Sequence, residues 1–409
     1  MSSYNFDEII SRKCTNSENV ESWRPFILGK DRDRSFAYPD DEFIRMWVAD
    51  MEFAVADEIR EAISQRLDRK IFGYTGVSDP EYYEIFEDWC KRRYNLSFKR
   101  EELVFSPGVI PALYQFVENL VSPGEKVLTF TPAYGYFKRA ADYNGIELLG
   151  SELLYDNGDY SIDFDDFERK LRDENVKLIF FCNPHNPTGR MWTVEEMKKV
   201  ADICEKYGTW VISDEIHCDL LRSGNKHMPM ANVMKDYDKL ITCISASKTF
   251  NLAGLMHSSI IIRDKQARYD FRKRDKLCGA CNPLSIEAHK AAYGKGERWL
   301  EELKAYIDEN LRYVESFLKE NIPGAIFRMP AATYFAWINF SEILPDVENL
   351  PLFFADNAGV LLEAGNAMFV GNAKGFVRLN LAMPKSYVAE AMDRIKAAIE
   401  KYESGDYIR

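Results

Sequence analysis

The middle of the chain alternates short apolar runs with longer segments whose apolar positions recur every three or four residues. The first pattern predicts buried strands, and the second predicts amphipathic helices. The expected strands are 126–131, 176–182, 209–213, 240–245 and 257–262. Residues 194–207 predict a crossover helix, with Thr193 as its N-cap and Gly208 at its end. Strands that alternate with helices are typical of an α/β domain with a mostly parallel sheet.

The C-terminal part of the chain has a different pattern. A long amphipathic helix is predicted over 300–318, and the sequence Asn-Ile-Pro-Gly at 321–324 ends it. A strand is predicted over 334–340, and a final helix has one apolar face, formed by Val388, Met392, Ile395, Ile399 and Tyr402. We therefore expect an N-terminal arm (1–48) that is part of a small domain, a large domain (49–290) and a small C-terminal α+β domain (291–409).

Composition and charge exclude several classes of function. The chain has 409 residues and a formal net charge of −12, whereas nucleic-acid binders need clustered Lys and Arg. No stretch approaches the roughly 18 apolar residues of a membrane helix, and residues 1–13 lack the apolar core of a signal peptide. We therefore expect no nucleic-acid or membrane partner and a cytoplasmic location.

The cysteines are scattered along the chain, which is typical of free thiols in a reducing compartment. Cys278 and Cys281 form a single C-x-x-C motif. Because no second pair or neighbouring His accompanies it, we expect no metal site there.

Lys248 is the first candidate for chemistry. It lies in the segment Ser-Ala-Ser-Lys-Thr, residues 245–249, directly after an apolar strand. A lysine there can be a surface side chain whose stem packs on apolar neighbours. Alternatively, a desolvated amine loses basicity and becomes a nucleophile towards aldehydes. The hydroxyls of Ser245 and Ser247 could then bind a phosphate beside it.

Asp214 and His217 follow another expected strand. A carboxylate at the end of an apolar strand is costly unless it meets a cation or caps a helix. Asp214 is therefore either an N-cap or the partner of a protonated ring nitrogen. His217, three residues further on, can be structural or can contact the same ring.

Two further loops follow or precede apolar elements. Residues 182–190, Cys-Asn-Pro-His-Asn-Pro-Thr-Gly-Arg, form a stiff loop in which the amide of Asn186 can donate to a ligand. In the loop that begins at Phe105, Gly108 permits close approach of a ligand, and Val109 and Ile110 begin a helix. The free N–H groups of such a helix N-terminus can bind a phosphate.

Together these segments resemble fold-type I enzymes that use pyridoxal 5′-phosphate (PLP), the aspartate aminotransferase superfamily. The resemblance implies the PLP transferase fold, with a mostly parallel sheet of the seven-stranded type flanked by helices. It implies that Lys248 forms the Schiff base with PLP and acts in catalysis. Asp214 would face the pyridine nitrogen and Asn186 the ring hydroxyl and the substrate. Tyr134, in Thr-Pro-Ala-Tyr, would stack on the ring and also act in catalysis, and Arg378 would bind the substrate α-carboxylate.

Finer motifs are similar to the cystathionine β-lyase branch, which cleaves carbon–sulfur bonds. They are Met-Trp-Val-Ala-Asp-Met-Glu-Phe (46–53), Phe-Gly-Tyr-Thr-Gly (72–76), Asn-Pro-His-Asn-Pro-Thr-Gly-Arg-Met-Trp (183–192) and Asp-Glu-Ile-His (214–217). The branch implies that Tyr74 reaches the phosphate in the neighbouring subunit of a homodimer with shared sites, and that Ala49 lies near the substrate. Two positions depart from the superfamily: Met256 replaces a phosphate-binding Arg, and His217 replaces a Tyr.

The resemblance therefore implies a PLP-dependent carbon–sulfur β-lyase acting on an amino acid with a β-thioether. Such an enzyme releases a thiol, pyruvate and ammonia. A class I/II aminotransferase would need largely the same residues, because both reactions begin with proton removal from Cα. A PLP-bound regulatory protein is a further alternative from a different class.

Overall fold

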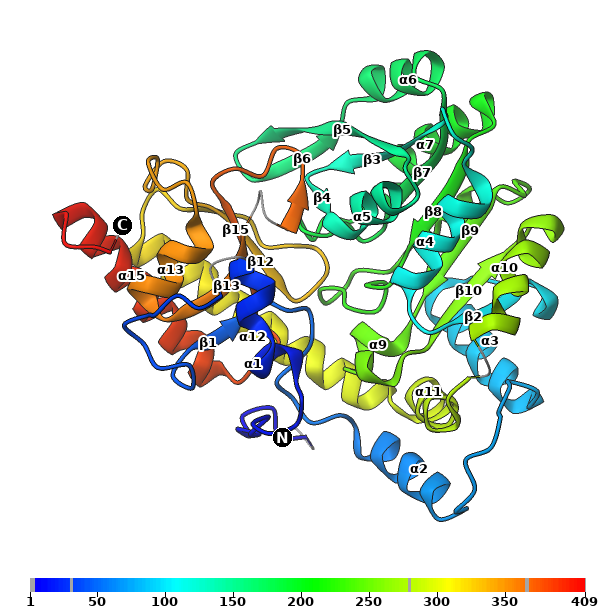
Figure 1. Ribbon diagram of the computed structural model, residues 1–409, viewed down its shortest axis with the longest axis horizontal. Helices are drawn as coiled ribbons and strands as arrows, with labels where there is room; N and C mark the ends of the chain where they lie inside the picture. Colours follow the sequence, from blue (N-terminus) through cyan, green and yellow to red (C-terminus); the bar gives the residue numbers. More distant parts are fainter. Residues whose placement is uncertain (1–3, 30–31, 279–280, 365–367, 409) are drawn as a thin grey trace.

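The computed structural model describes residues 4–29, 32–278, 281–364 and 368–408. It contains a larger sheet, on the right of Figure 1, and a smaller sheet on the left. In the described residues the larger sheet has eight strands, in the order β2 (Leu103–Ser106), β10 (Ser258–Ile262), β9 (Leu240–Ile244), β8 (Trp210–Asp214), β7 (Val176–Cys182), β3 (Lys126–Thr131), β5 (Glu147–Asp156) and β6 (Asp159–Ile162). The expected strands are thus present, with bounds that differ by at most one residue.

The centre of the larger sheet is parallel, as predicted. Strands β9, β8, β7, β3 and β5 run parallel to one another. The pairs β9–β10, β10–β2 and β5–β6 are antiparallel. The strand beyond the expected seven is β6, which pairs only with the end of β5. The turn between them is Asn157-Gly158, and both residues have positive φ, of 46° and 95°. This dipeptide favours a tight hairpin, and it accounts for the added strand.

Helices cover both faces of the larger sheet because alternate strand residues point to opposite sides. Leu178 and Phe180 of β7 share a core with α4 (Val109–Leu120), α5 (Gly135–Tyr143) and α10 (Lys265–Cys278). Ile179 and Phe181 share a core with α6 (Phe164–Asp173) and α7 (Val194–Tyr207). The central strands are therefore buried on both faces, as their continuous apolar runs predict.

The expected crossover helix is α7, with the predicted bounds. The Thr193 hydroxyl accepts the Glu196 N–H at 3.1 Å, and the Glu196 carboxylate accepts the Thr193 N–H at 2.9 Å. Gly208 ends the helix with φ of 65°. This reciprocal capping satisfies two N–H groups that the first turn leaves free, so the sequence sets both ends of the helix.

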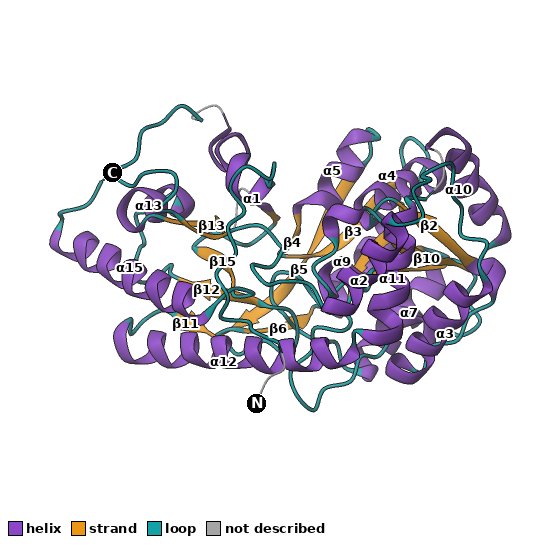
Figure 2. Cartoon of the chain, turned by 90° about the horizontal axis from the view of Figure 1, so that it is seen from below, coloured by secondary structure: helices purple, strands orange, loops and turns teal. Residues whose placement is uncertain are grey.

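The smaller sheet joins the N-terminal arm to the C-terminal part of the chain. Its described strands are, in order, β1 (Ile44–Met46), β13 (Val360–Ala364), β15 (Phe376–Asn380), β12 (Phe335–Asn339) and β11 (Ile326–Phe327). Strand β1 is parallel to β13, and the other pairs are antiparallel. Figure 2 shows α12 (Glu297–Asn321) along the lower side of this sheet beside α15 (Lys385–Ser404), whereas α13 (Leu350–Ala358) packs on α15 and β13. The domain boundaries at 48/49 and 290/291 stay a prediction.

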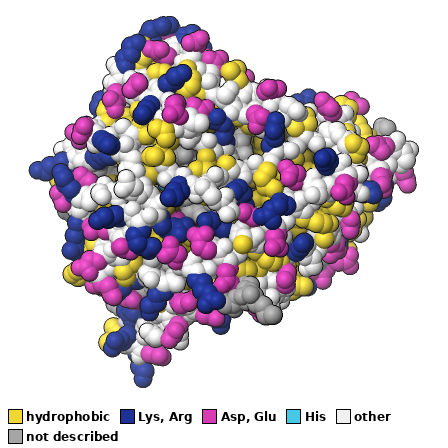
Figure 3. All heavy atoms as spheres, turned by 180° about the vertical axis from the view of Figure 1, so that it is seen from behind, with side chains coloured by type: hydrophobic (Ala, Val, Ile, Leu, Met, Phe, Trp, Pro, Cys, Tyr) yellow, Lys and Arg dark blue, Asp and Glu magenta, His cyan; other side chains and the backbone are white. Residues whose placement is uncertain are grey.

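The remaining elements are short or lie around the larger sheet. They are α1 (Glu18–Glu21), α2 (Asp57–Leu67), α3 (Pro80–Tyr94), α8 (Met230–Val233), α9 (Ala246–Thr249), α11 (Pro283–Lys295), the pair β4 (Ala133–Tyr134) and β14 (Phe369–Val370), and the single turns 24–28, 100–102 and 253–255. None of the described helices is long and apolar enough to cross a membrane. On the face in Figure 3, positive and negative side chains are interspersed.

The cysteines agree with the expected free thiols where their side chains are described. Cys90, Cys182, Cys204, Cys218 and Cys243 are buried and form no disulfide. The C-x-x-C motif at Cys278 includes residues 279–280, which lie outside the described residues. Among the described residues, no group of three or more His, Cys, Asp or Glu is arranged to hold a metal ion.

Candidate active site

The predicted site segments follow the carboxyl ends of neighbouring parallel strands. Lys248 follows β9, Asp214 ends β8, the loop with Asn186 follows β7, and Tyr134 follows β3. Since these strands are adjacent and parallel, their carboxyl ends lie at one edge of the sheet, where ligands bind in open α/β folds. In Figure 1 this edge faces the smaller sheet, which supplies Arg378 from β15.

Lys248 lies on the short helix α9 with its side chain half-buried. Its Nζ donates to the carbonyl oxygen of Ala49 at 2.7 Å. The same carbonyl accepts the hydroxyl of Tyr334 at 3.0 Å. Burial lowers the pKa of Lys248, because an ammonium loses hydration there. The amine is therefore held beside the predicted substrate segment in a setting that favours its neutral form.

Asp214 is a buried carboxylate without a cationic partner among the described residues. Its Oδ1 accepts the N–H of Ile216 at 3.2 Å, and the charge of Lys248 has a smaller influence on its pKa than burial has. Burial raises the pKa of Asp214 to about 6, partly opposed by the hydrogen bond from Ile216. The bond to Ile216 closes a turn, and no helix begins at these described residues, so the alternative of a helix N-cap is wrong. The missing counter-charge leaves room for the other alternative, a protonated ring nitrogen.

His217 is buried close to the smaller sheet. Its ring is 5.7 Å from the ring of Phe335 and edge-on to it, and its Nδ1 has no hydrogen-bond partner in the described residues. Burial lowers the pKa of His217 to about 3, so the imidazole is neutral at pH 7. A neutral ring with an unused nitrogen can contact a ligand without adding charge.

Arg378 and Asn186 are joined across the two sheets. Nη1 of Arg378 donates to Oδ1 of Asn186 at 3.0 Å, and Nη2 donates to the carbonyl of Trp47 at 3.2 Å. The guanidinium carbon lies 3.9 Å from the ring centroid of Phe335, and Glu363 forms an ion pair with Nη2. The Asn186 amide N–H₂ stays available, while the guanidinium is fixed from several sides.

The start of α4 and the hydroxyl of Ser247 have the features of a phosphate site. Helix α4 begins at Val109 after Gly108 and has no side-chain cap, so the first N–H groups, including that of Ile110, are free to bind an anion. The hydroxyl of Ser247 is half-buried. Ser245 instead donates to the carbonyl of His257 at 2.9 Å and accepts the Ser247 N–H at 3.1 Å.

Tyr134 and Tyr74 differ sharply in their surroundings. Tyr134 is half-buried in β4, opposite Phe369 of β14, and burial raises its pKa. Tyr74 is fully exposed, so within a single chain it contacts none of the other predicted site residues. Met256, where the superfamily has an Arg, is also exposed.

Sequence reasoning missed the residues that fix segment 47–50. Nδ2 of Asn380 donates to the carbonyls of Val48 and Asp50, at 2.7 and 2.5 Å. Arg12 pairs with the carboxylates of Asp50, at 2.6 Å, and Glu52, at 2.8 Å. Asn380 lies two residues after Arg378, a usable signal, but the pairing of Arg12 has no local signature.

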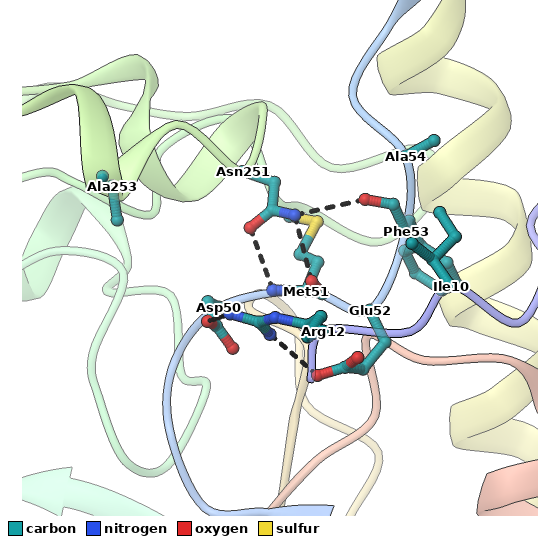
Figure 4. A pocket seen from close by; sticks show the side chains of 10 residues that line it. Ile10, Arg12, Asp50, Met51, Glu52, Phe53, Ala54, Asn251 and Ala253 are labelled. Carbon is teal, nitrogen blue, oxygen red and sulfur yellow. Dashed lines mark hydrogen bonds and ion pairs between the residues drawn. The ribbon is translucent and has the colours of Figure 1, made fainter. Parts of the chain in front are cut away.

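Beside this segment lies a cavity of about 300 Å³, lined by Arg12 and Asn251 among others. Figure 4 shows Arg12 between Asp50 and Glu52, and Asn251 directed at the backbone of the adjoining residues 51–53. Oδ1 of Asn251 accepts the Met51 N–H at 3.0 Å, and its Nδ2 donates to the Met51 carbonyl at 3.0 Å. The N-terminal arm and the residues after Lys248 thus hold the same wall of the site.

The fold is that of a known family. Residues 42–395 match the model of aminotransferase class I and II, and the chain belongs to that family.

Within it, the chain is 40% identical to cystathionine β-lyase PatB of Bacillus subtilis (strain 168), over 87% of this chain and 92% of that protein. It is 44% identical to the PLP-bound C–S lyase of Staphylococcus hominis, with a TM-score of 0.92 and coverage of 97% and 98%. Cystalysin of Treponema denticola, whose structure contains pyridoxal 5′-phosphate, is 32% identical, with a TM-score of 0.91 and coverage of 98% and 99%.

Proposed function

We propose that the protein is a PLP-dependent carbon–sulfur β-lyase that cleaves cystathionine or related S-substituted cysteines to a thiol, pyruvate and ammonia. One observation carries the proposal: a half-buried amine, Lys248, and a buried carboxylate without an ion-pair partner, Asp214, lie at the ends of the adjacent strands β9 and β8, at the sheet edge that Arg378 faces. The similarity to named lyases supports the choice of reaction.

The residues present fit PLP. Asp214 would hold the pyridinium nitrogen, because it is a buried anion that lacks a cation. The free N–H groups at the start of α4 and the hydroxyl of Ser247 would hold the phosphate. The amide of Asn186 and the unused nitrogen of His217 would contact the ring, and Tyr134 would stack on it. Lys248 would provide the covalent attachment. When bound, PLP supplies an electron sink for the amino acid's Cα.

The chain's own groups then perform binding and proton transfer. Arg378 holds the α-carboxylate through N–H groups that its other contacts leave free, since its Nε has no partner among the described residues. Lys248 Nζ takes the proton from Cα, a task for which its lowered pKa suits it. Segment 47–50 positions this amine through the carbonyl of Ala49. Loss of the Cα proton weakens the Cβ–S bond, so the thiolate leaves, and water completes the conversion to pyruvate and ammonium.

The exposed apolar segment at residues 71–74 supports a homodimer with shared sites. Ile71 is 74% exposed, Phe72 52% and Tyr74 fully. A second copy that buried these side chains would bring Tyr74 to the phosphate of the other protomer. The dimer is tested by mixing inactive Tyr74→Phe and Lys248→Ala chains, which should regain activity in hybrid dimers because one composite site escapes both changes. A fully active monomer would contradict the shared site.

The buried free thiols support a cytoplasmic location.

The reaction is tested with L-cystathionine and purified holoenzyme. Pyruvate and a free thiol should form without any added keto acid, and Lys248→Ala should form neither. Fast amino transfer to 2-oxoglutarate with negligible pyruvate would replace the lyase by an aminotransferase. Absence of both reactions, together with capture of a regulator protein, would favour the regulatory alternative.

A further inference from the structure

Glu363 is a buried carboxylate that no sequence motif singles out. It lies in β13 after the apolar residues 360–362, and only 5% of its surface is exposed. In the antiparallel pairing of β13 with β15 it lies directly opposite Arg378, so both side chains are on the same face of the smaller sheet. The two form an ion pair in which Arg378 is 1% exposed. A buried ion of either sign alone would be strongly destabilising, so each charge depends on the other.

The carboxylate of Glu363 shares the guanidinium that would bind the substrate. Of the five N–H donors of Arg378, one on Nη1 points to Asn186, and Nη2 is engaged by Trp47 and by the ion pair with Glu363. Its Nε has no partner among the described residues. The guanidinium of Arg378 therefore keeps N–H donors for one carboxylate, but Glu363 already compensates the positive charge of Arg378. A ligand with a single carboxylate can be held by the remaining donors, whereas a second carboxylate nearby would meet the negative charge of Glu363.

The field of Glu363 reaches the catalytic space. After burial, its carboxylate is the largest influence that raises the pKa of Tyr134, the expected stacking residue. It also acts on the pKa of Lys248, although burial, Asp50 and Arg378 each have a larger influence there. The nearby cation Arg139 is exposed and stacks on Tyr136 at 4.6 Å. Water and salt screen an exposed charge far more than a buried one, so Glu363 dominates over Arg139 inside the site.

We propose that Glu363 is a specificity-determining residue: its carboxylate beside Arg378 makes the site favour S-substituted cysteines with a neutral or cationic substituent and reject those with a carboxylate near the sulfur. The inference rests on the proposed function, because it takes Arg378 as the clamp for the α-carboxylate. The charge of Glu363 would also exclude dicarboxylic amino acids and dicarboxylic keto acids.

The test compares two nearly isosteric substrates on the holoenzyme, S-carbamoylmethyl-L-cysteine (neutral) and S-carboxymethyl-L-cysteine (anionic). In the wild type, kcat/KM for pyruvate release should be about tenfold or more higher for the neutral substrate, which corresponds to about 1.4 kcal/mol. Glu363→Gln should bring this ratio close to one, mainly by improving the anionic substrate. Glu403→Gln, the same change at an exposed position of α15, should leave it unchanged.

The outcomes separate the two proposals. Pyruvate from both substrates at equal kcat/KM in the wild type overturns the role of Glu363 and leaves the lyase intact. A ratio that stays the same in Glu363→Gln overturns it as well. If Glu363→Gln does not fold, the wild-type ratio alone decides. No pyruvate from either substrate or from cystathionine means that the proposed function has failed.

Discussion

The two sides of the site are built in different ways. On the larger sheet, Lys248, Asp214 and Asn186 each follow their own strand, so sequence order and parallel pairing bring them together. On the smaller sheet, Arg378 is fixed by Trp47, which is far from it in the chain, and by Glu363 on the neighbouring strand β13. We propose that the first side bears the reactive groups and that the second aligns the substrate. The groups of the first side are brought together by the order of neighbouring strands, whereas those of the second depend on tertiary pairing.

The largest effect is expected on the reactive side. Lys248→Ala should reduce pyruvate release by about 10⁴-fold or more, because it removes both the covalent attachment of PLP and the base for the Cα proton. Lys198→Ala, at an exposed position of α7, should keep wild-type turnover. Appreciable turnover in Lys248→Ala would place the reactive amine elsewhere.

A smaller loss is expected for Asp214→Asn. The variant should lose about 10²- to 10³-fold in kcat, because an amide cannot supply the counter-charge of the ring nitrogen. It should also bind PLP more weakly in an equilibrium titration. Asp202→Asn on the exposed side of α7 serves as the control. Near-normal kcat would leave Asp214 with only its turn-closing bond to Ile216.

Asp214→Asn should also stabilise the protein when PLP is removed. The pKa of Asp214 is raised to about 6 in the fold, so folding favours its protonated form, and its ionised form costs stability. This cost is absent below the unfolded pKa near 4 and is complete above pH 6. Apo Asp214→Asn should therefore unfold at a higher temperature than apo wild type at pH 8, by on the order of 2–3 kcal/mol in free energy of unfolding. The gain should vanish near pH 4, and a gain independent of pH would contradict the burial cost.

On the aligning side, Arg378→Lys should raise KM by about ten- to a hundredfold with a smaller change in kcat. An ammonium cannot keep the bonds to Asn186 and Trp47 and also bind a carboxylate in two-pronged fashion. Steady-state kinetics with cystathionine measure this, with Arg298→Lys at an exposed position of α12 as control. Unchanged KM would remove Arg378 from the substrate site.

The smallest effect is expected at the N-terminal arm. Arg12→Ala should lower kcat/KM by about two- to fivefold, since it frees Asp50 and loosens the segment whose Ala49 carbonyl holds Lys248. Because Arg12 is partly exposed, high salt should reduce the difference from wild type. A change as large as that of Arg378→Lys would give the arm a direct role.

Much of the fold could be predicted because local signals agree with it. Thr193 and Gly208 set both ends of α7, and the apolar runs of β7, β8 and β9 match strands buried on both faces. The added strand β6 escaped, although the Asn-Gly turn before it favours a hairpin, because it has only four residues and two of them are exposed. Glu363 and Arg12 escaped because an ion pair between two separate elements leaves no periodic pattern in the sequence. Tyr74 stays a prediction that rests on the resemblance, because within one chain its exposed side chain contacts no other predicted site residue.

The most direct test of the account is chemical trapping of the cofactor on the reactive side. The purified protein should absorb in the visible range as a PLP Schiff base, and borohydride should bleach it while fixing the cofactor covalently. Digestion and peptide mass mapping should then place the modification on Lys248, in the peptide that contains residues 245–254. A modification on any other lysine, or none at all, would contradict the account.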